Sequence, residues 1–286
     1  MQYIIITPAK NEEAFIDYTI RSVLAQTVRP KKWILVDDGS KDKTAEIVAQ
    51  YATDHEFLRL VRKNSSSEQR SGGSKVIRAF YVGYNAMADH DYDIIVKMDA
   101  DLTLPSKYFE EVIRCFENNP RVGLCGGYCV IDEKGTLVPE EYSEDHVRGA
   151  FKAYRKQCFI DIGGLKQIWS WDGIDESAVR LHGWQLKVLP LPVLHHRPTS
   201  KEYNILKHSF TSGFHMYKER VDLVSLFVIS VLHLYRRPVI IGSFLYLLGY
   251  FISWIGREEK VIDIALGTYI RRDRFKSIRK KLSCFI

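Results

Sequence analysis

Two aspartates separated by one residue offer the most specific chemistry in the chain. Asp99 and Asp101 directly follow the mostly apolar run Ile94–Met98, which has the character of a buried strand. Carboxylates at positions i and i+2 beyond a strand end can converge on one hard divalent cation, which keeps open coordination positions for phosphate oxygens. Asp-x-Asp also occurs in solvated turns, so its meaning depends on the other motifs of the chain.

Polar clusters also follow two earlier apolar runs. Thr7–Glu13 follows the run Tyr3–Ile6, and Asp37–Ser40 follows the run Trp33–Val36. Because the carboxyl ends of parallel strands meet at one edge of a sheet, we expect these clusters and the two aspartates to share a ligand site there.

Helical patterns alternate with these strand-like runs through the first two-thirds of the chain. Asn11 is a good N-cap for a helix whose apolar face carries Ile16 and Ile20, and Pro30 marks its end. Further helices are expected over about 44–52 and 76–87, and a further strand over 57–61. This order predicts an α/β fold with a mixed, mostly parallel sheet and helices on both faces.

Three ordered segments, Ile6–Glu13, Val36–Ser40 with Thr44, and Met98–Asp101, resemble the inverting nucleotide-sugar glycosyltransferases of family 2. The resemblance covers about residues 1–200. It implies the GT-A fold, a Rossmann-like nucleotide-diphospho-sugar transferase domain, with the nucleotide-sugar half over about 1–101 and the acceptor half over about 102–200. It also implies a UDP- or GDP-sugar donor and a bound Mn²⁺ or Mg²⁺.

The resemblance also assigns donor-binding roles. The segment from Thr7 to Glu12 would hold the base and ribose, although many members have an aromatic residue where Lys10 stands, so Lys10 would instead reach a phosphate. Gly72–Lys75 resembles the small-residue and lysine segment near the donor. The implied nucleotide-sugar-binding residues are Thr7, Pro8, Ala9, Glu12, Asp38, Lys75 and Asp99.

The metal would be held by Asp101, and by His195, which follows the apolar stretch Val188–Leu194 where several members place a histidine. A divalent cation there would offset the negative charge that develops on the leaving nucleoside diphosphate.

An inverting transfer also needs a carboxylate that takes the proton of the attacking hydroxyl. Trp171–Glu176 resembles the acidic motif of the family that opens a helix. Counting back 11 residues from Gly183 favours Asp172, and counting forward from Gly163-Gly164 favours Asp175. Both are therefore candidate bases, and Glu176 is a third possibility.

The region 201–286 has a different character and is expected to be helical. The stretches Leu223–Tyr235 and Val239–Ile255 contain no Asp, Glu, Lys or Arg. Arg236 and Arg237 lie between them. The longer stretch would be about 25 Å as a helix, short of a hydrocarbon core of about 30 Å. We expect two in-plane or re-entrant helices at an anionic membrane surface, with a helical hairpin buried in a soluble domain as the alternative.

The charge balance of the chain agrees with a membrane partner rather than a nucleic acid. The net charge of the 286 residues is +6, and the segment Arg271–Lys281, with seven basic residues and one acidic residue, accounts for all of it. The five cysteines form no C-x-x-C pair, and no signal-peptide pattern opens the sequence, which favours reduced thiols and the cytoplasmic face of a membrane.

The resemblance to family 2 implies metal-dependent transfer of a sugar to a hydroxyl of a glycan or lipid-linked acceptor. The alternatives are transfer to a polyprenyl phosphate and a non-catalytic, nucleotide-binding membrane adaptor. A nucleotidyltransferase is disfavoured because the chain has no glycine before Gly39 and so lacks an early glycine-rich phosphate loop.

Overall fold

The apolar runs of the N-terminal half form parallel strands. β1 (Tyr3–Ala9) pairs with β2 (Lys32–Asp37) on one side and β4 (Ile94–Met98) on the other, and β2 pairs with β3 (Leu58–Arg62). The three polar clusters therefore lie at one edge of the sheet, as expected.

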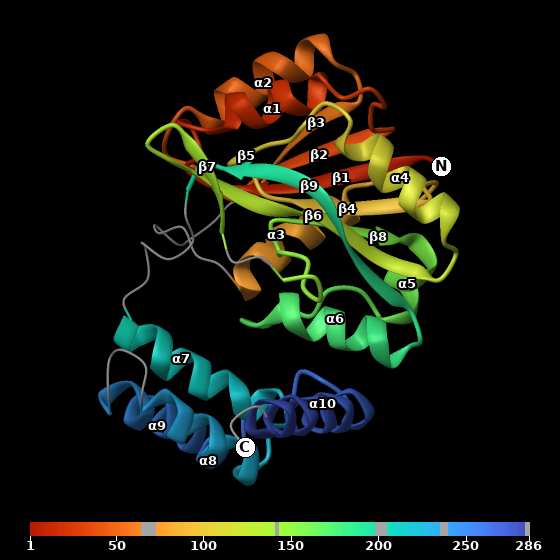
Figure 1. The fold of residues 1–286 in the computed structure, drawn as a ribbon. Helices are drawn as coiled ribbons and strands as arrows, with labels where there is room; N and C mark the ends of the chain where they lie inside the picture. Colours follow the sequence, from red (N-terminus) through yellow and green to blue (C-terminus); the bar gives the residue numbers. More distant parts are fainter. Residues whose placement is uncertain (64–72, 141–142, 198–204, 235–239, 284–286) are drawn as a thin grey trace. The chain divides into compact units, whose positions relative to one another are not determined.

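The computed structural model describes residues 1–63, 73–140, 143–197, 205–234 and 240–283 (Figure 1). It divides into two units, of which the first is Met1–Leu165 with His182–Pro198 and the second is Lys166–Leu181 with Thr199–Ile286. Of the segment Gly72–Lys75 that the sequence places near the donor, Gly72 lies outside the described residues.

The rest of the sheet mixes strand directions. Antiparallel β8 (Phe151–Arg155) joins β4 to β6 (Val122–Glu133), which in turn pairs in parallel with β9 (Gln185–His195). β5 (Leu102–Thr103) completes the order β3-β2-β1-β4-β8-β6-β9-β5, and β7 (Thr136–Pro139) pairs with β6. The predicted α/β fold with a mixed sheet is confirmed.

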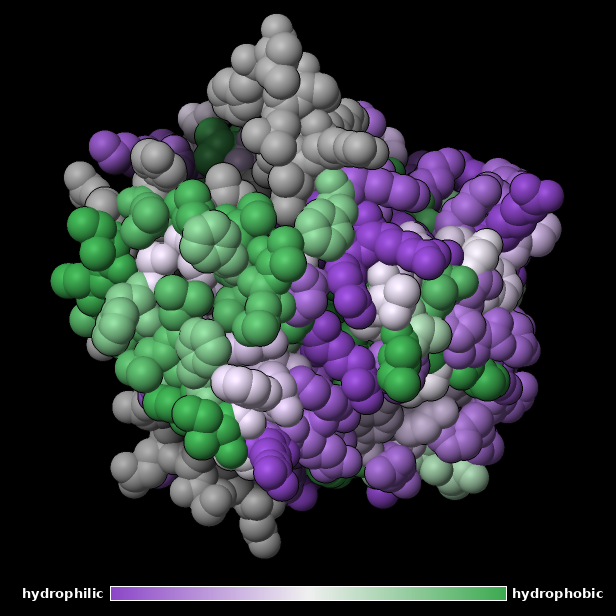
Figure 2. All heavy atoms as spheres, turned by 90° about the horizontal axis from the view of Figure 1, so that it is seen from below, coloured by the Kyte–Doolittle hydropathy of each residue, from purple (hydrophilic) through white to green (hydrophobic). Residues whose placement is uncertain are grey.

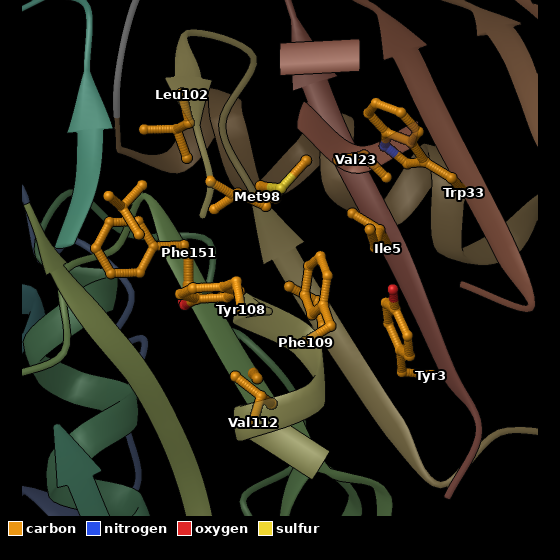
Figure 3. Close-up of a cluster of buried hydrophobic side chains, with 14 of the residues drawn as sticks. Tyr3, Ile5, Val23, Trp33, Met98, Leu102, Tyr108, Phe109, Val112 and Phe151 are labelled. Atoms are coloured by element: carbon orange, nitrogen blue, oxygen red, sulfur yellow. The ribbon is translucent and has the colours of Figure 1, made fainter. Parts of the chain in front are cut away.

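One face of the sheet carries the main hydrophobic core. Because side chains alternate along a strand, Tyr3 and Ile5 point to the same face, where they meet Trp33 and Phe109 (Figure 3). The helices on this face are α1 (Ile16–Leu24), α2 (Thr44–Asp54) and α4 (Tyr108–Asn118).

The opposite face is covered by α3 (Ser74–Asn85) and α5 (Lys156–Asp161). Gly83 of α3 lies so close to the sheet that an added Cβ would come within 2.7 Å of Val36 and 2.8 Å of Ile6. This glycine lets the helix approach the strands β1 and β2 closely. We call the edge of the sheet that carries the three polar clusters the donor edge, because the sequence predicts donor binding there.

The predicted N-cap at Asn11 is wrong. The helix α1 begins at Ile16, and Asn11 adopts a φ of 53°. Its side-chain oxygen accepts a hydrogen bond from the Lys41 N–H at 2.9 Å, and its own N–H donates to Ser40 Oγ at 3.0 Å. Asparagine tolerates this left-handed conformation because its short side chain can bond locally. Asn11 therefore connects the segments that follow β1 and β2.

The second unit is helical. It contains α6 (Trp171–Leu181), α7 (Ile205–Lys218), α8 (Leu223–His233), α9 (Ile241–Ile255) and α10 (Ile264–Ser283). Among the described residues, none of the helices combines the length and apolar character needed to cross a membrane.

Candidate active site

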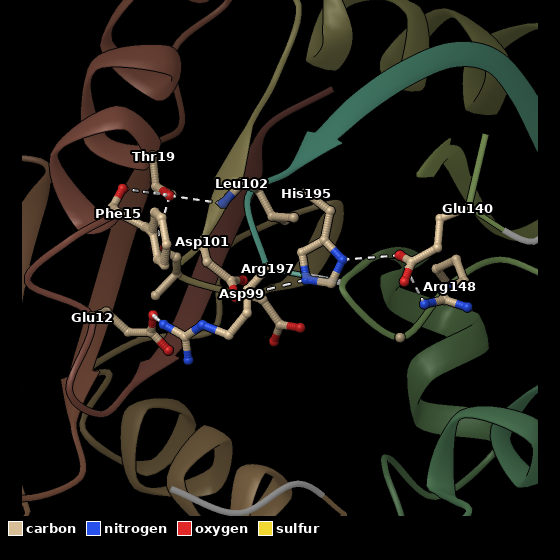
Figure 4. A network of polar contacts seen from close by, with 12 residues as sticks. Glu12, Phe15, Thr19, Asp99, Asp101, Leu102, Glu140, Arg148, His195 and Arg197 are labelled. Carbon is tan, nitrogen blue, oxygen red and sulfur yellow. Dashed lines mark hydrogen bonds and ion pairs between the residues drawn. The ribbon is translucent and has the colours of Figure 1, made fainter. Parts of the chain in front are cut away.

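The turn after β4 is held in place by a threonine from α1. Thr19 Oγ1 donates to the Ala100 carbonyl at 2.8 Å and accepts the Leu102 N–H at 3.0 Å (Figure 4). Thr19 is fully buried, so this small hydroxyl fixes the backbone between the two aspartates and β5. Sequence reasoning did not identify Thr19.

Asp101 and His195, the two predicted metal ligands, come together. β5 pairs Leu102 with His195, which brings His195 Nε2 to 3.7 Å from Asp101 Oδ2. Both residues are buried, and the His196 N–H donates to the Asp101 carbonyl at 3.0 Å. The backbone of β9 thus positions the imidazole opposite the carboxylate.

A glutamate that the sequence did not single out orients this histidine. Glu140, just after β7, has its Oε2 atom 3.1 Å from His195 Nδ1, and Arg148 Nη2 donates to the same oxygen at 3.2 Å (Figure 4). The His195 ring therefore faces Asp101 with one nitrogen and Glu140 with the other. Metal-binding histidines commonly direct their second nitrogen to a carboxylate in this way.

The side-chain atoms of Asp101 and His195 are of the kinds that bind divalent cations. Burial by itself lowers the pKa of His195, but hydrogen bonds and charge from Asp101, Cys129 and Glu140 outweigh it and raise that pKa to about 11. The surroundings of the ring thus already stabilise a positive charge. A carboxylate with an imidazole fits Mn²⁺ or Mg²⁺, while the nearby set Cys129, Glu140 and His195, with ligand atoms within 4.8 Å of one another, would suit a softer ion.

Asp99 is paired with a buried lysine. The amine of Lys97, a side chain that is only 2% exposed, donates to Asp99 Oδ1 and to the Gly149 carbonyl, the latter at 2.7 Å. The Asp99 N–H donates to the Ala150 carbonyl at 2.7 Å. Lys97 therefore connects the end of β4 to the segment that precedes β8.

Glu12 and Asp38 lie at the donor edge, each beside a cation. Arg197 Nη2 donates to Glu12 Oε2 at 2.8 Å, with the guanidinium 5.1 Å from the Phe15 ring centroid. Lys63 Nζ donates to Asp38 Oδ1 at 2.7 Å. These pairs place both predicted carboxylates in fixed positions.

The other residues predicted to bind the nucleotide sugar differ in how accessible their side chains are to a ligand. The Thr7 hydroxyl is buried and accepts the Trp33 indole N–H at 2.9 Å, so contact with a ligand would involve the backbone of β1, which includes Pro8 and Ala9. Lys10, expected to reach a phosphate, is buried and donates to the Asp38 carbonyl at 3.0 Å. Lys75 is partly exposed in the first turn of α3.

The candidate bases belong to the second unit, on α6. Asp172 lies in the first turn and is partly exposed, whereas Asp175 is buried, with its Oδ1 accepting the Glu176 N–H at 2.7 Å. Glu176 is also buried, 3.9 Å from Arg180. The predicted acidic opening of a helix is thus present, and Asp172 is its most accessible carboxylate.

Relatives of known name are similar over part of the chain. The poly-β-1,6-N-acetyl-D-glucosamine synthase of Staphylococcus aureus (strain COL) is 22% identical over 205 residues, 63% of this chain and 46% of the relative. The glycosyltransferase EpsJ of Bacillus subtilis (strain 168), described as uncharacterized, is 31% identical over 147 residues, 50% of this chain and 39% of the relative. The chain spans less than half the length of these relatives.

Solved structures share the fold at low identity. S. aureus TarS 1-349 in complex with UDP-GlcNAc matches with a TM-score of 0.57 and 16% identity, over 90% of this chain and 73% of that chain. The Pyrobaculum calidifontis mannosyltransferase PcManGT in complex with GDP-Man and Mn²⁺ matches with a TM-score of 0.57 and 15% identity, over 99% of this chain and 82% of that chain. The family model "Glycosyl transferase family 2" matches residues 4–167, more than half of the sequence. With its GT-A fold, this chain therefore belongs to glycosyl transferase family 2.

Proposed function

We propose that this glycosyltransferase transfers one sugar from a nucleoside diphosphate to an acceptor hydroxyl, with inversion and with a divalent cation. The observation that carries the proposal is the buried pair Asp101–His195 beyond the end of β4, with the partly buried Glu140 on the other side of the imidazole. A buried carboxylate and an oriented imidazole beside a nucleotide-binding edge are what a diphosphate-bound cation requires.

The donor would lie along the ends of β1, β2 and β4. The backbone from Thr7 to Ala9 would face the base, while Glu12 and Asp38, fixed by Arg197 and Lys63, would accept hydrogen bonds from base or ribose hydroxyls. Asp99 would accept from a ribose or sugar hydroxyl. Lys75 would add a positive charge near the diphosphate, in the first turn of α3.

Asp101 and His195 would hold Mn²⁺ or Mg²⁺. When bound, the cation offsets the charge of the departing diphosphate. The task of this chain's own residues is to keep the two ligand atoms facing each other, which Thr19 does for the aspartate turn and Glu140 for the imidazole.

Asp172 or Asp175 would act as the base. As the acceptor oxygen forms its bond to the anomeric carbon, the bond from that carbon to the phosphate oxygen breaks, and the nucleoside diphosphate leaves with the electron pair. The acceptor proton passes to the carboxylate. Attack opposite the leaving group inverts the anomeric configuration. Asp172 is the first to test because it is the more accessible of the two.

The proposed location is the cytoplasmic face of an anionic membrane, as a peripheral or re-entrant protein. Two features support it: the four described cysteines are free thiols, and 15 Lys and Arg stand against 7 Asp and Glu between residues 199 and 286.

The test is a donor screen with Mn²⁺ or Mg²⁺ and released nucleoside diphosphate as the signal. UDP-GlcNAc comes first because TarS was solved with it, and GDP-mannose second because PcManGT was solved with it. We expect turnover that a chelator removes and that Asp101→Asn lowers by about 1,000-fold.

Asp54→Asn, an exposed aspartate at the end of α2, is the matched control and should leave turnover unchanged. Nucleotide affinity that is the same with and without chelator would refute the metal role. Absence of both nucleotide binding and turnover for every donor would refute the transferase.

A further inference from the structure

Helices α8 and α9 expose many of their large apolar residues and bury small and polar ones, together with Leu226 and two tyrosines. On α9, Phe244 is 63% exposed and Ile255 is 76% exposed, and on α8 Phe227 is 67% exposed. The residues that α9 turns inward are Gly242, Ser243, Tyr246, Gly249, Tyr250 and Ser253. This is the reverse of a helix on the surface of a water-soluble domain.

The exposed apolar side chains form one surface. They recur at helical spacing along each helix, and Figure 2 shows hydrophobic residues gathered in one region of the face it presents. Proteins surrounded by water rarely expose so many contiguous large apolar side chains. We call this surface the apolar face; its members are Leu223, Val224, Phe227 and Val231 of α8 and Ile241, Phe244, Leu248, Phe251, Ile252, Trp254 and Ile255 of α9.

The interior of the helical unit is packed in a manner common among helices surrounded by lipid. An added Cβ on Gly213 of α7 would lie 1.8 Å from the Tyr246 carbonyl oxygen, and one on Gly249 would lie 2.2 Å from the Phe210 carbonyl oxygen. Ser243 Oγ donates to the Ser230 carbonyl at 2.6 Å, joining α9 to α8. Small residues that let backbones touch are typical where lipid, rather than water, covers the outer side of the helices.

Charge and length identify a bilayer surface as the occupant of the apolar face. Near it along the chain, Arg257 at the end of α9 and Arg271 and Arg272 of α10 are exposed. The region 199–286 is strongly basic, which complements anionic headgroups. α9 has 15 residues, about 22 Å of helix, which is enough to lie in one leaflet and too short to cross both.

The helix that carries the candidate bases is built into this same unit. The residue before α6, Ser170, donates its hydroxyl to the buried Glu219 at the end of α7, and Arg274 of α10 lies 3.6 Å from Glu219. The ring centroids of Trp169 and His208 are 5.8 Å apart, which adds a second link to α7. Since α7 contacts α9 backbone to backbone, α6 and the apolar face belong to one body.

We propose that this unit is a membrane-docking platform for the acceptor: the apolar face enters one leaflet of an anionic bilayer, α6 is held at the headgroup level, and the acceptor is a lipid-linked hydroxyl compound. The proposal rests on the transferase function and names its acceptor class. It gives a reason for an acidic helix that carries the candidate bases to belong to the same unit as the apolar face.

The experiment uses the full chain, vesicles of phosphatidylcholine and phosphatidylglycerol containing total membrane lipids of the source organism, and a radiolabelled donor chosen by the screen. Vesicle binding, label in the organic phase and nucleotide affinity are measured in parallel. Phe227→Glu with Phe244→Glu should lower vesicle binding by about 100-fold and lower lipid labelling with it, while nucleotide affinity stays unchanged. Ile160→Glu, an exposed isoleucine of α5, is the matched control and should change none of the three readings.

Vesicle binding that survives the double substitution would overturn the docking. A dimer that dissociates in the double variant would show that a second copy, and not lipid, covers the face. Label that enters only water-soluble products, or no labelled lipid although the donor is bound, would overturn the acceptor class. Because nucleotide affinity is read separately, failure of the platform is distinguishable from failure of the transferase.

Discussion

The two units depart from the usual distribution of residues in opposite directions. The donor edge of the first unit buries ionisable side chains, such as Asp101 at 1% and Lys97 at 2% exposure. The helical unit exposes large apolar side chains, such as Ile255 at 76%. Buried charge and exposed apolar surface are both unfavourable in a protein surrounded only by water.

The difference lies in what offsets each cost. At the donor edge the protein itself supplies the partners: Lys97 for Asp99, Arg197 for Glu12, and Glu140 with Arg148 around His195. In the helical unit, the side chains of the apolar face remain exposed, and no described residue covers them. Under the membrane-docking proposal, lipid covers this face. The first unit therefore pairs its buried charges internally, whereas the second leaves a set of large apolar side chains exposed.

The largest effect is expected from Gly213→Ala, which would break the helical unit alone. The added methyl would lie 1.8 Å from the Tyr246 carbonyl oxygen, so α7 and α9 would have to separate. We expect a loss of about 3 kcal/mol or more in the stability of this unit. Circular dichroism should show the helical transition at a lower temperature, with vesicle binding lost and nucleotide affinity retained.

Gly173→Ala is the control for that change. No atom lies within 4 Å of a Cβ at Gly173, which is also in a helix of the second unit, so alanine should raise stability by up to about 1 kcal/mol. A parallel loss of nucleotide affinity in Gly213→Ala would show that the two units do not behave as separate bodies.

Sequence reasoning correctly placed the three polar clusters at one edge of the sheet, because local patterns determine the strands that they follow. Apolar runs that end in Thr7–Glu13, Asp37–Ser40 and Asp99–Asp101 place three polar clusters at one edge once the strands are parallel. Thr19, Glu140 and Arg197 were missed, because their roles depend on contacts between distant segments that carry no local signal. The nearest available signal for Arg197 was its position two residues after His195.

The helical unit was only partly predictable. The two uncharged stretches correctly indicated α8 and α9, since their composition sets their character. The association of α6 and the residues before it with α7 and α10 could not be read from the sequence. One of its contacts is the partly buried hydrogen bond between Ser170 and Glu219, 49 positions apart, and neither residue has an unusual neighbourhood in the chain.

A smaller effect is expected from Lys97→Met, which removes the buried cation at the donor edge while keeping the side-chain volume. Asp99 would lose its nearest positive charge and the Gly149 carbonyl its donor, at a cost of about 2–3 kcal/mol in the free energy of unfolding. Denaturant unfolding monitored by tryptophan fluorescence checks this.

Lys32→Met is the matched control, because Lys32 pairs with Asp89 at 2.5 Å on the surface, with both side chains about a third or more exposed. A pair exposed in this way contributes at most about 1 kcal/mol. An equal decrease in the free energy of unfolding in the two variants would mean that burial adds nothing to the Lys97–Asp99 pair. Buried charge would then not distinguish the first unit from the helical unit.

The smallest effect, and the one that sharpens the comparison most, concerns Glu140→Gln. Glutamine keeps an oxygen that can accept from His195 Nδ1, so the ring stays in place, but the negative charge that stabilises the imidazole is lost. We expect the Mn²⁺ affinity, measured by electron paramagnetic resonance with UDP present, to fall by about tenfold. Glu133→Gln, an exposed change at the end of β6, should leave it unaltered. Unchanged affinity in Glu140→Gln would mean that His195 is not a ligand through Nε2, and that the buried polar cluster maintains the fold of the hairpin rather than the binding of a cation.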